Sequence, residues 1–471
     1  MGNTNRAGTD MPSVDEQVRL LMRGVVYGDE GVARAMESEL RERLAEGRPL
    51  RIYLGIDPTA PDLTLGHTVP MRKLRQFQQL GHEAVLLIGG FTALVGDPSD
   101  KESARPMLTL EEIEANGRTY AEQAFKILDR ERTVVRNNAE WLSKLTFEEL
   151  IKLASNFTVG QFLQRDNFAR RRERGDPIYV HEFFYAFMQA YDAVALETDA
   201  QVGATEQLFN LMAGRTLQRS YGQRPQVAIC MPILVGTDGR LRMSKSQGNY
   251  IALNDPPEEM YGKVMSLPDD VMIDYFTLVT DVPSEGVEEI RRKLAERLVN
   301  PMDVKKRLAR EIVTDLHGAE AAHKAEESFE RTIQRGELPQ EAKEVVFRHE
   351  DWLEVKKHGL ASQRELVWSG NAEERFAQMS AEERAERFPG SVGWSEEELK
   401  HCHVVSLALL LVKVGLVESR SQARGLIAEG AVDIDGKSCA SPVVRIKEGA
   451  TITIRVGKHR FLRIVDADKQ A

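Results

Sequence analysis

Residues 51–90 read RIYLGIDPTAPDLTLGHTVPMRKLRQFQQLGHEAVLLIGG. The first six residues are mostly apolar and favour a buried strand, which the following Asp-Pro step ends because proline lacks a backbone donor. Helical spacing of apolar residues follows over 66–80, with Gly81 as its stop. Residues 84–88 are wholly apolar, which is typical of a parallel sheet covered on both faces. This order predicts a βαβ unit in an α/β, Rossmann-like doubly wound parallel sheet.

On either side of this unit, the sequence pattern predicts several different kinds of secondary structure. A capping-box pattern at Ser13 opens a helical stretch that runs to about residue 44. Residues 227–235 are apolar and predict a further strand, which a Thr-Asp-Gly turn follows. Residues 256–336 are helical and charged in pattern, and strong apolar periodicity resumes at residue 404.

Length and composition restrict the class of protein. The 471 residues suit about three domains, and an apolar share of 42% can form real hydrophobic cores. Three cysteines without paired spacing argue against a disulfide framework or a zinc site and predict a reducing compartment. No apolar run approaches the ~18 residues that cross a membrane, and the first residues lack a signal-peptide core. We therefore expect a cytoplasmic protein without a membrane partner.

The net charge of −10 argues at first against a nucleic-acid partner, because phosphate binding needs concentrated positive charge. The charge is unevenly distributed, however. Residues 401–471 hold eleven Lys and Arg against seven Asp and Glu, a net charge of +4, so the remainder carries −14. An acidic body with a basic C-terminal segment remains compatible with RNA binding.

Two polar loops carry residues suited to phosphate chemistry. Residues 57–67 join the first strand to its helix, where free N–H groups and the helix dipole attract anions. There Gly66 permits close approach and His67 supplies a donor. Residues 242–249, RMSKSQGN, combine cations and hydroxyls beside glycine, which suits gripping and releasing a polyphosphate. Taken singly, each also fits an ordinary capped turn or a solvated basic turn.

Taken together, the two loops resemble the paired signatures of class I aminoacyl-tRNA synthetases. A further segment, EFFYAFMQAYD at 182–192, places Tyr185, Gln189 and Asp192 at i, i+4 and i+7, on one face of a helix. Because the rest of that helix is apolar, the polar trio either is satisfied inside a core or lines a pocket.

With YLGIDPT at 53–59, GDPS at 96–99 and EQLFN at 206–210, this trio resembles the bacterial tyrosyl-tRNA synthetases. The resemblance is close over about residues 50–255 and again over the last seventy residues. It implies that Tyr53 and Asp192 hold the phenol hydroxyl of the amino acid, since that pair offers a donor and an acceptor. The other tyrosine-binding residues would be Asp97, Tyr185, Gln189 and Gln207.

The resemblance also implies activation of L-tyrosine by ATP with Mg²⁺, then transfer to tRNA(Tyr) for protein synthesis. No tightly bound cofactor and no protein-held metal is implied. The enzyme would position reactants and stabilise developing charge rather than supply a nucleophile. His67 would bond the α-phosphate, and the β and γ phosphates would meet Thr59, Thr64, Arg242 and Lys245. The ATP-binding residues would be Asp57, Gly55, Gly66, His67, Glu206, Arg242, Met243, Ser244, Lys245 and Ser246.

Three positions depart from the family pattern. Thr64 stands where the first histidine of the His-x-Gly-His signature is usual, so an imidazole becomes a hydroxyl. Arg242 replaces the first lysine of the Lys-Met-Ser-Lys-Ser signature, which keeps the charge but changes its geometry. Glu206 stands where an aspartate on the ribose is expected.

The C-terminal segment resembles the small α+β RNA-binding domain of the S4 type. RNA phosphates would meet Arg420 and Arg424, which are i and i+4 on one helix, together with Lys437, Lys458 and Arg460. A charged helix face with no RNA partner is the alternative for these residues.

The expected domain order follows from pattern and resemblance together. An N-terminal helical extension at 1–49 precedes the Rossmann-like catalytic domain at 50–255, which has an insertion at about 110–180. An all-helical domain on the anticodon side of the tRNA follows at 256–345, then a linker region at 346–402 and the S4-type domain at 403–471. The resemblance implies a homodimer with an interface near residues 156–174, where Phe157, Val159 and Phe162 lie beside an arginine cluster.

Other functions remain open from the sequence. A tryptophan-tRNA ligase shares the fold and both signatures, although the Tyr53/Asp192 pair argues for a hydroxyl in the substrate. An RNA-binding module with an inactive synthetase site is marked by the Thr64 change. A nucleotidyltransferase that shares only the phosphate loop is disfavoured by the RNA-binding tail.

Overall fold

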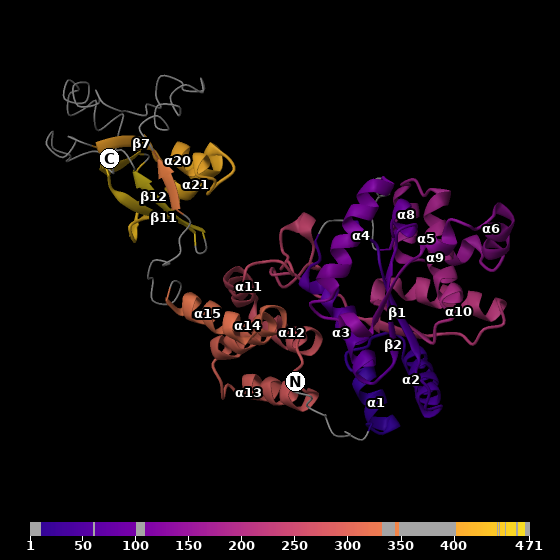
Figure 1. The fold of residues 1–471 in the computed structure, drawn as a ribbon. Coiled ribbons are helices and arrows are strands. Elements are labelled where there is room, and N and C mark those ends of the chain that lie inside the picture. Colours follow the sequence, from indigo (N-terminus) through magenta and orange to yellow (C-terminus); the bar gives the residue numbers. More distant parts are fainter. Residues whose placement is uncertain are drawn as a thin grey trace, which may run out of the picture. The chain divides into compact units, whose positions relative to one another are not determined.

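The computed structural model describes residues 11–59, 62–99, 109–331, 344–347, 402–439, 441, 443–447, 449–457 and 460–466. The chain divides into two compact units, residues 1–325 and 326–471 (Figure 1). The expected residue Lys458 lies outside the described part.

A parallel sheet of five strands organises the first unit. Its strands are β1 (Arg51–Ile56), β2 (Glu83–Ile88), β3 (Thr133–Asn137), β4 (Ala200–Ala204) and β5 (Val227–Met231). They lie in the order β3-β2-β1-β4-β5, and every neighbouring pair is parallel. This confirms the predicted doubly wound sheet. The chain leaves β1 toward β2 on one side and returns as β4 on the other, so β1 marks the point where a ligand crevice forms.

Helices cover both faces of this sheet. In Figure 1, α3 and α4 lie on one side of β1 and β2, and α9 and α10 lie on the other. The helices up to β5 are α1 (Val14–Met22), α2 (Glu30–Ala45), α3 (Leu65–Gln79), α4 (Leu110–Ala124), α5 (Ala139–Leu142), α6 (Phe147–Ala154), α7 (Val159–Leu163), α8 (Asp166–Arg174), α9 (Val180–Ala195) and α10 (Leu208–Ser220).

Two predicted elements differ in extent from the structure. The stretch after Ser13 keeps its capping box but forms two helices, because Gly24 and Gly28 adopt positive φ angles of 72° and 74° between them. The strand expected over 227–235 ends at Met231, where Pro232 cannot supply the next ladder donor. By contrast, α3 begins and ends within one residue of the prediction, and Gly81 follows it with φ 82°.

The insertion expected at about 110–180 starts later than predicted. Strand β3 pairs with β2 over its whole length, so α4 and β3 complete a second crossover of the sheet itself. The segment outside the sheet therefore begins no earlier than Asn138. Sequence reasoning missed β3 because it is an edge strand with exposed valines and no continuous apolar run.

The helical region that follows is as predicted over the described residues. It consists of α11 (Pro257–Met265), α12 (Met272–Val279), α13 (Ser284–Ala295), α14 (Pro301–His317) and α15 (Ala319–Phe329). Helix α12 packs on α13 and α14 and also on α3. Because α3 covers the parallel sheet, this contact attaches the helical region to that sheet.

The second unit is a small α+β domain. Its five-stranded sheet has the order β6-β12-β11-β8-β9, built from β6 (Glu344–Phe347), β8 (Val432–Ile434), β9 (Lys437–Ser438), β11 (Thr451–Val456) and β12 (Arg460–Asp466). Strands β7 (Cys402–Ser406) and β10 (Val443–Lys447) form a separate pair, and helices α20 (Leu407–Lys413) and α21 (Arg420–Ala428) complete the unit. One apolar cluster that includes Leu411, Ile427 and Ile454 is its core.

Strand β6 corrects one expected boundary. It pairs in parallel with β12, so residues 344–347 belong to the C-terminal sheet rather than to the helical domain that was expected to end at 345. Residues 344–347 give no local sign of this pairing, because a long segment poor in aliphatic residues separates them from their partners in β12.

Candidate active site

The candidate site lies where the sheet changes direction. Asp57 follows β1, and η3 (Thr205–Gln207) follows β4, so both meet at the carboxyl ends of neighbouring strands. Gly55, the last but one residue of β1, is exposed, and the nearest atom to a Cβ there would be Tyr53 Cε2 at 3.9 Å. A ligand can therefore lie directly against the backbone at this point.

His67 stands in the first turn of α3, behind the N-cap residue Thr64. The Thr64 N–H donates to His67 Nδ1 at 3.1 Å, and the Thr64 hydroxyl lies 2.9 Å from the same nitrogen. Because Nδ1 accepts from the backbone, the proton of a neutral imidazole resides on Nε2. Thr64 is buried, so its hydroxyl contacts His67 rather than the solvent.

The protonation of His67 is set by its surroundings. His67 is an exposed residue, although protein atoms around its ring desolvate the imidazole. This desolvation, together with the charge of Lys245, lowers the pKa of His67 to about 4. At neutral pH the ring therefore offers one neutral N–H donor on Nε2.

Backbone hydrogen bonds join the first signature loop to the residues that directly follow the second. Thr64 and Ala252 form an antiparallel bridge, in which Leu65 N–H donates to Ile251 O at 2.8 Å and Leu253 N–H donates to Leu63 O at 3.0 Å. The side chain of Met243 packs against Gly66, since a Cβ at that glycine would lie 3.7 Å from Met243 Cβ. Residues 57–67 and 242–249 are therefore in direct contact at Gly66 and Met243.

Both cations of the second loop lie near carboxylates. Arg242 Nη1 is 3.4 Å from Glu206 Oε2, and Lys245 Nζ is 3.4 Å from Asp62 Oδ2. Within the loop, the hydroxyls of Ser244 and Ser246 lie 2.9 Å apart. Glu206, predicted on the ribose, thus faces Arg242.

The predicted trio on α9 lies on its buried face. Tyr185, Gln189 and Asp192 are all buried. Gln189 Nε2 donates to Gln207 Oε1 at 3.3 Å, and Gln207 Nε2 donates to Asp97 Oδ2 at 2.8 Å. This chain brings three predicted residues from three separate segments together. Burial, followed by the charges of Asp57 and Asp97, raises the pKa of Tyr185 well above its usual value, which keeps that phenol neutral.

Asp192 is held by two residues that sequence reasoning missed. Trp141 Nε1 donates to Asp192 Oδ1 at 2.7 Å, and Asn138 Nδ2 donates to Oδ2 at 3.2 Å. Tyr53 is fully buried, and its hydroxyl donates to the carbonyl of Gln189 at 3.5 Å. Burial raises the pKa of Asp192 to about 8, although both hydrogen bonds oppose that rise.

Asp57 belongs to the same network. The hydroxyl of Thr92, in η1 (Thr92–Leu94), donates to Asp57 Oδ1 at 2.7 Å and accepts from Asn138 Nδ2 at 3.1 Å. A Cβ at Gly89 would stand 2.0 Å from the same carboxylate oxygen, so only glycine leaves room for Asp57. The residues after β1, β2 and β3 thus converge on one polar cluster.

The raised pKa of Asp192 predicts a pH-dependent stability. A folded-state pKa above the unfolded value contributes stability that is complete below pH ~4 and is lost as the pH rises through about 8. We therefore expect Asp192→Asn to melt at an increasingly higher temperature relative to the wild type as the pH rises from 5 to 8. Differential scanning calorimetry without ligands measures this difference, and a difference independent of pH would contradict the assignment.

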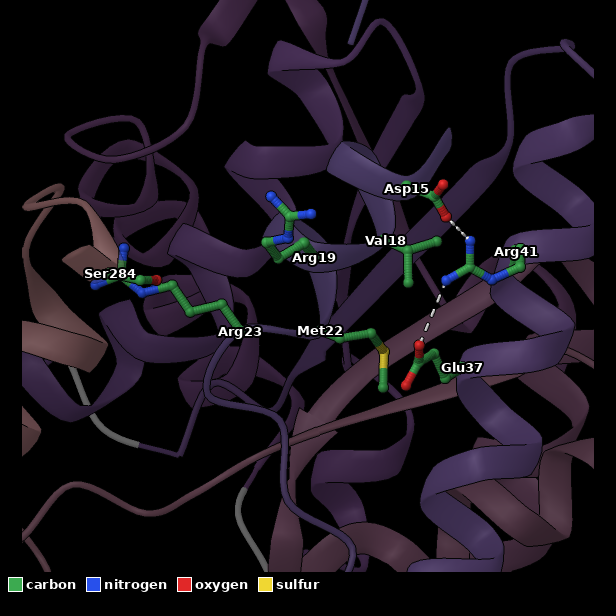
Figure 2. A pocket seen from close by; sticks show the side chains of 8 residues that line it. All are labelled: Asp15, Val18, Arg19, Met22, Arg23, Glu37, Arg41 and Ser284. Atoms are coloured by element: carbon green, nitrogen blue, oxygen red, sulfur yellow. Dashed lines mark hydrogen bonds and ion pairs between the residues drawn. The ribbon is translucent and has the colours of Figure 1, made fainter. Parts of the chain in front are cut away.

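Other features lie apart from this site. Among the described residues, no group of three or more His, Cys, Asp or Glu could hold a metal ion. In that part of the chain no helix is both long and apolar enough to span a membrane. A pocket of about 550 Å³ lies between α1, α2 and the start of α13 (Figure 2). None of the residues above lines it, and within it Arg41 pairs with Asp15 and Glu37.

The expected RNA-binding residues are in the second unit. Arg420 and Arg424 both lie on α21, and Arg424 and Lys437 are exposed. Arg460 begins β12 and donates to the carbonyl of Leu416 at 2.6 Å. Arg420, Arg424, Lys437 and Arg460 thus all lie in described elements of the second unit.

Comparison with known proteins shows which family the chain belongs to. The model of tRNA synthetases class I (W and Y) matches residues 45–334, and the S4 domain model matches residues 406–452. The tyrosine–tRNA ligase of Thermotoga maritima is 44% identical over 450 residues, which is 96% of this chain and 97% of that protein. The tyrosine–tRNA ligase of Moorella thermoacetica is 44% identical over 455 residues and 96% of each chain.

A solved structure agrees with these matches. The tyrosyl-tRNA synthetase of Archaeoglobus fulgidus, complexed with L-tyrosine, superposes with a TM-score of 0.54 at 26% identity, covering 67% of this chain and 100% of that one. The chain therefore belongs to the class I tRNA synthetases (W and Y). Its full-length relatives place it, within that class, in the tyrosine–tRNA ligase family.

Proposed function

We propose that this protein activates L-tyrosine with ATP to give tyrosyl-adenylate and pyrophosphate, and then transfers tyrosine to the 3′ end of tRNA(Tyr) in protein synthesis. The observation that carries the proposal is one continuous site. A buried Tyr53/Asp192 pair, suited to a phenol, lies in the same polar network as Asp57, which leads into the two joined phosphate loops.

The phenol end of the pocket explains the choice of amino acid. Burial, with a further contribution from the charge of Asp192, raises the pKa of Tyr53 well above its usual value, so Tyr53 stays a neutral donor. Asp192 is the acceptor. A substrate hydroxyl between them would bond to both, whereas phenylalanine offers neither of them a hydrogen bond and sets an apolar ring against two buried polar groups.

The ammonium end would be held by acceptors. The carboxylate of Asp97 and the amide oxygens of Gln189 and Gln207 belong to the chain described above, and the buried hydroxyl of Tyr185 lies near Asp97. An ammonium group has three donors and needs such oxygens on several sides. The amino acid would thus lie along α9 with its carboxylate toward β1.

Charge stabilisation would come from the two signature loops. The carboxylate oxygen of tyrosine attacks the α-phosphorus, and the bond from that phosphorus to the bridging oxygen breaks. His67 Nε2–H would bond the α-phosphate as its charge grows, and Arg242, Lys245 and Thr59 would bind the departing pyrophosphate with its Mg²⁺. Thr64 acts through His67, because its hydroxyl is directed at Nδ1.

The remaining ATP-binding assignments follow position in the site. Gly55 and Gly66 present open backbone, and Asp57 adjoins the adenylate. Met243, Ser244 and Ser246 form the wall of the second loop, while Glu206 orients Arg242 and lies near the ribose.

The first step is tested by tyrosine-dependent exchange between pyrophosphate and ATP. Purified protein should catalyse it with tyrosine but not with tryptophan or phenylalanine. Exchange with tryptophan would favour a tryptophan–tRNA ligase, and no exchange with any amino acid would favour an RNA-binding module with an inactive site.

RNA binding by the second unit gives a separate prediction. The double variant Arg420→Ala/Arg424→Ala should raise the KM for tRNA about tenfold and lower the salt dependence of that KM, because two phosphate contacts are lost. Tyrosine activation should be unchanged. Aminoacylation at 50 and 200 mM salt measures both effects.

A matched control uses two exposed cations of the catalytic unit. Arg34→Ala/Lys152→Ala removes the same charge, from α2 and α6, where the side chains are largely exposed. It should leave the KM for tRNA within twofold of the wild type. An equal rise in both double variants would reject the assignment of α21 as the RNA contact.

We further propose a cytoplasmic homodimer. Of the expected interface residues, Phe162 is buried in a core cluster with Phe187, and Phe157 is partly buried against that cluster. Exposed apolar side chains lie nearby on α6, α7 and the start of α9, namely Phe147, Ile151, Val159, Tyr179 and Val180. These would form the contact surface, and sedimentation velocity tests the dimer.

A further inference from the structure

The segment between β5 and α11 contains a buried asparagine that has no part in the scheme above. Asn249 follows η4 (Lys245–Gln247) and is 5% exposed. Its Oδ1 accepts from Ser244 N–H at 2.9 Å. Its Nδ2 donates to Asp238 Oδ2 at 2.9 Å and to the carbonyl of Arg242 at 3.1 Å. One amide thus fixes the chain on both sides of Met243.

The partner Asp238 is itself held rigidly. Its Oδ1 accepts from the N–H groups of Arg240 and Leu241 at 3.0 and 3.1 Å, inside a hairpin closed by the bridge between Val235 and Arg242. These backbone bonds lower the pKa of Asp238, so it is a carboxylate acceptor at neutral pH. We call this pair the Asp238–Asn249 clasp.

The space around Asn249 leaves it no alternative position. A Cβ at Gly236 would stand 2.3 Å from Asn249 Cγ, far inside any real contact. Thr237 N–H also donates to the carbonyl of Asn249 at 2.9 Å. Gly236 and Asn249 are therefore in close contact at the base of the loop that carries residues 242–249.

The clasp fixes the backbone from which the side chains of Arg242 and Lys245 extend. It bonds the carbonyl of Arg242 and the N–H of Ser244, and Lys245 is the next residue. The ion pairs of Arg242 and Lys245 both measure 3.4 Å, long for charge-assisted hydrogen bonds. The position of the Arg242 and Lys245 side chains therefore depends more on the fixed backbone than on these ion pairs.

We propose that Asn249 is a positioning residue for tyrosine activation, which acts by holding Arg242 and Lys245 where they meet the departing pyrophosphate. This inference rests on the proposed function. Pyrophosphate is present only in the first step, and transfer to tRNA begins after it has left. Loss of Asn249 therefore slows activation and leaves transfer unchanged, which a general loss of structure would not do.

The first test is Asn249→Ala in the full-length protein. We expect kcat for tyrosine-dependent exchange to fall about 10- to 100-fold, the cost of misplacing catalytic groups by roughly 1 Å. The KM for tyrosine and the single-turnover rate of transfer from preformed adenylate to tRNA should stay within twofold. Asn254→Ala, at an exposed asparagine five residues further on, is the matched control and should keep the wild-type kcat.

The second test exchanges the two partners of the clasp. Asn249→Asp alone sets two carboxylates against each other and should lower kcat at least as much as Asn249→Ala. Adding Asp238→Asn lets the amide at 238 donate to the carboxylate at 249, which still accepts from Ser244 N–H but gives up the bond to the carbonyl of Arg242. The double variant should recover at least tenfold in kcat over Asn249→Asp.

Three results would overturn the inference. They are a kcat for Asn249→Ala within twofold of the wild type, an equal loss in activation and transfer, and no recovery in the exchanged pair. If Asn249→Ala fails to fold, the exchanged pair still decides between these outcomes. Failure of the wild type to exchange pyrophosphate would instead reject the proposed function, so the two failures are distinguishable.

Discussion

Replacing His67 by alanine should lower kcat for tyrosine activation by about 10²- to 10³-fold, with little change in the KM for tyrosine. The reason is that His67 Nε2–H meets charge that appears only as the α-phosphate becomes five-coordinate, and loss of one such preorganised donor has a cost of that order. Exchange of pyrophosphate with ATP at saturating tyrosine measures kcat, and a loss of less than threefold would contradict the role.

Two amide variants distinguish the nitrogens of the ring. In His67→Gln the side-chain amide can place an N–H near the position of Nε2, so part of the activity should return. In His67→Asn the amide reaches only the position of Nδ1, which in the native protein accepts from Thr64 N–H. Greater activity in the asparagine variant would show that the assigned tautomer is wrong.

Replacing Asp192 by alanine should lower kcat/KM for tyrosine by about 10²- to 10³-fold. The substrate hydroxyl loses its acceptor, and the donors of Trp141 and Asn138 lose theirs in a buried site. Because burial raises the pKa of Asp192, the carboxylate is costly to the apoprotein, and the melting temperature should not fall in proportion to activity. Steady-state exchange kinetics and calorimetry together measure this difference.

Trp141→Phe tests the support around that carboxylate. It removes one hydrogen bond to Asp192 and keeps most of the ring volume, so the KM for tyrosine should rise about tenfold. The KM for ATP should not change, because no phosphate-binding residue touches Trp141 in this network. A rise in both constants would indicate a general distortion of the pocket.

The parts of the fold that sequence could predict were those with one strong local pattern. The apolar runs of β1, β2 and β5 need two covered faces, and α3 carries both its helical spacing and its glycine stop. Strand β4 was missed because Ala200–Ala204 contains only one β-branched residue, although its neighbours on both sides make it a central strand. Its strand conformation comes from tertiary pairing rather than from local preference.

The site divides in a similar way. Tyr185, Gln189 and Asp192 could be predicted because helical spacing alone puts them on one face. Asn138 and Trp141 could not, since one precedes and the other lies within a helix of only four residues, and no periodic pattern marks them. Their hydrogen bonds to Asp192 depend on the tertiary fold, in which the carboxyl end of β3 lies beside α9. The burial of Phe162, expected at an interface, was equally beyond a local pattern.

The antiparallel bridge between Thr64 and Ala252 makes the spacing of the chain a functional quantity. Residues 63–65 and 251–253 are in fixed register, so adding or removing one residue just before that bridge would slip the pairing by about 3.3 Å per residue. Such a slip would carry Lys245 away from His67 without altering any side chain at the site. The bridge thus constrains the number of residues between Asn249 and Ile251 more tightly than their identity.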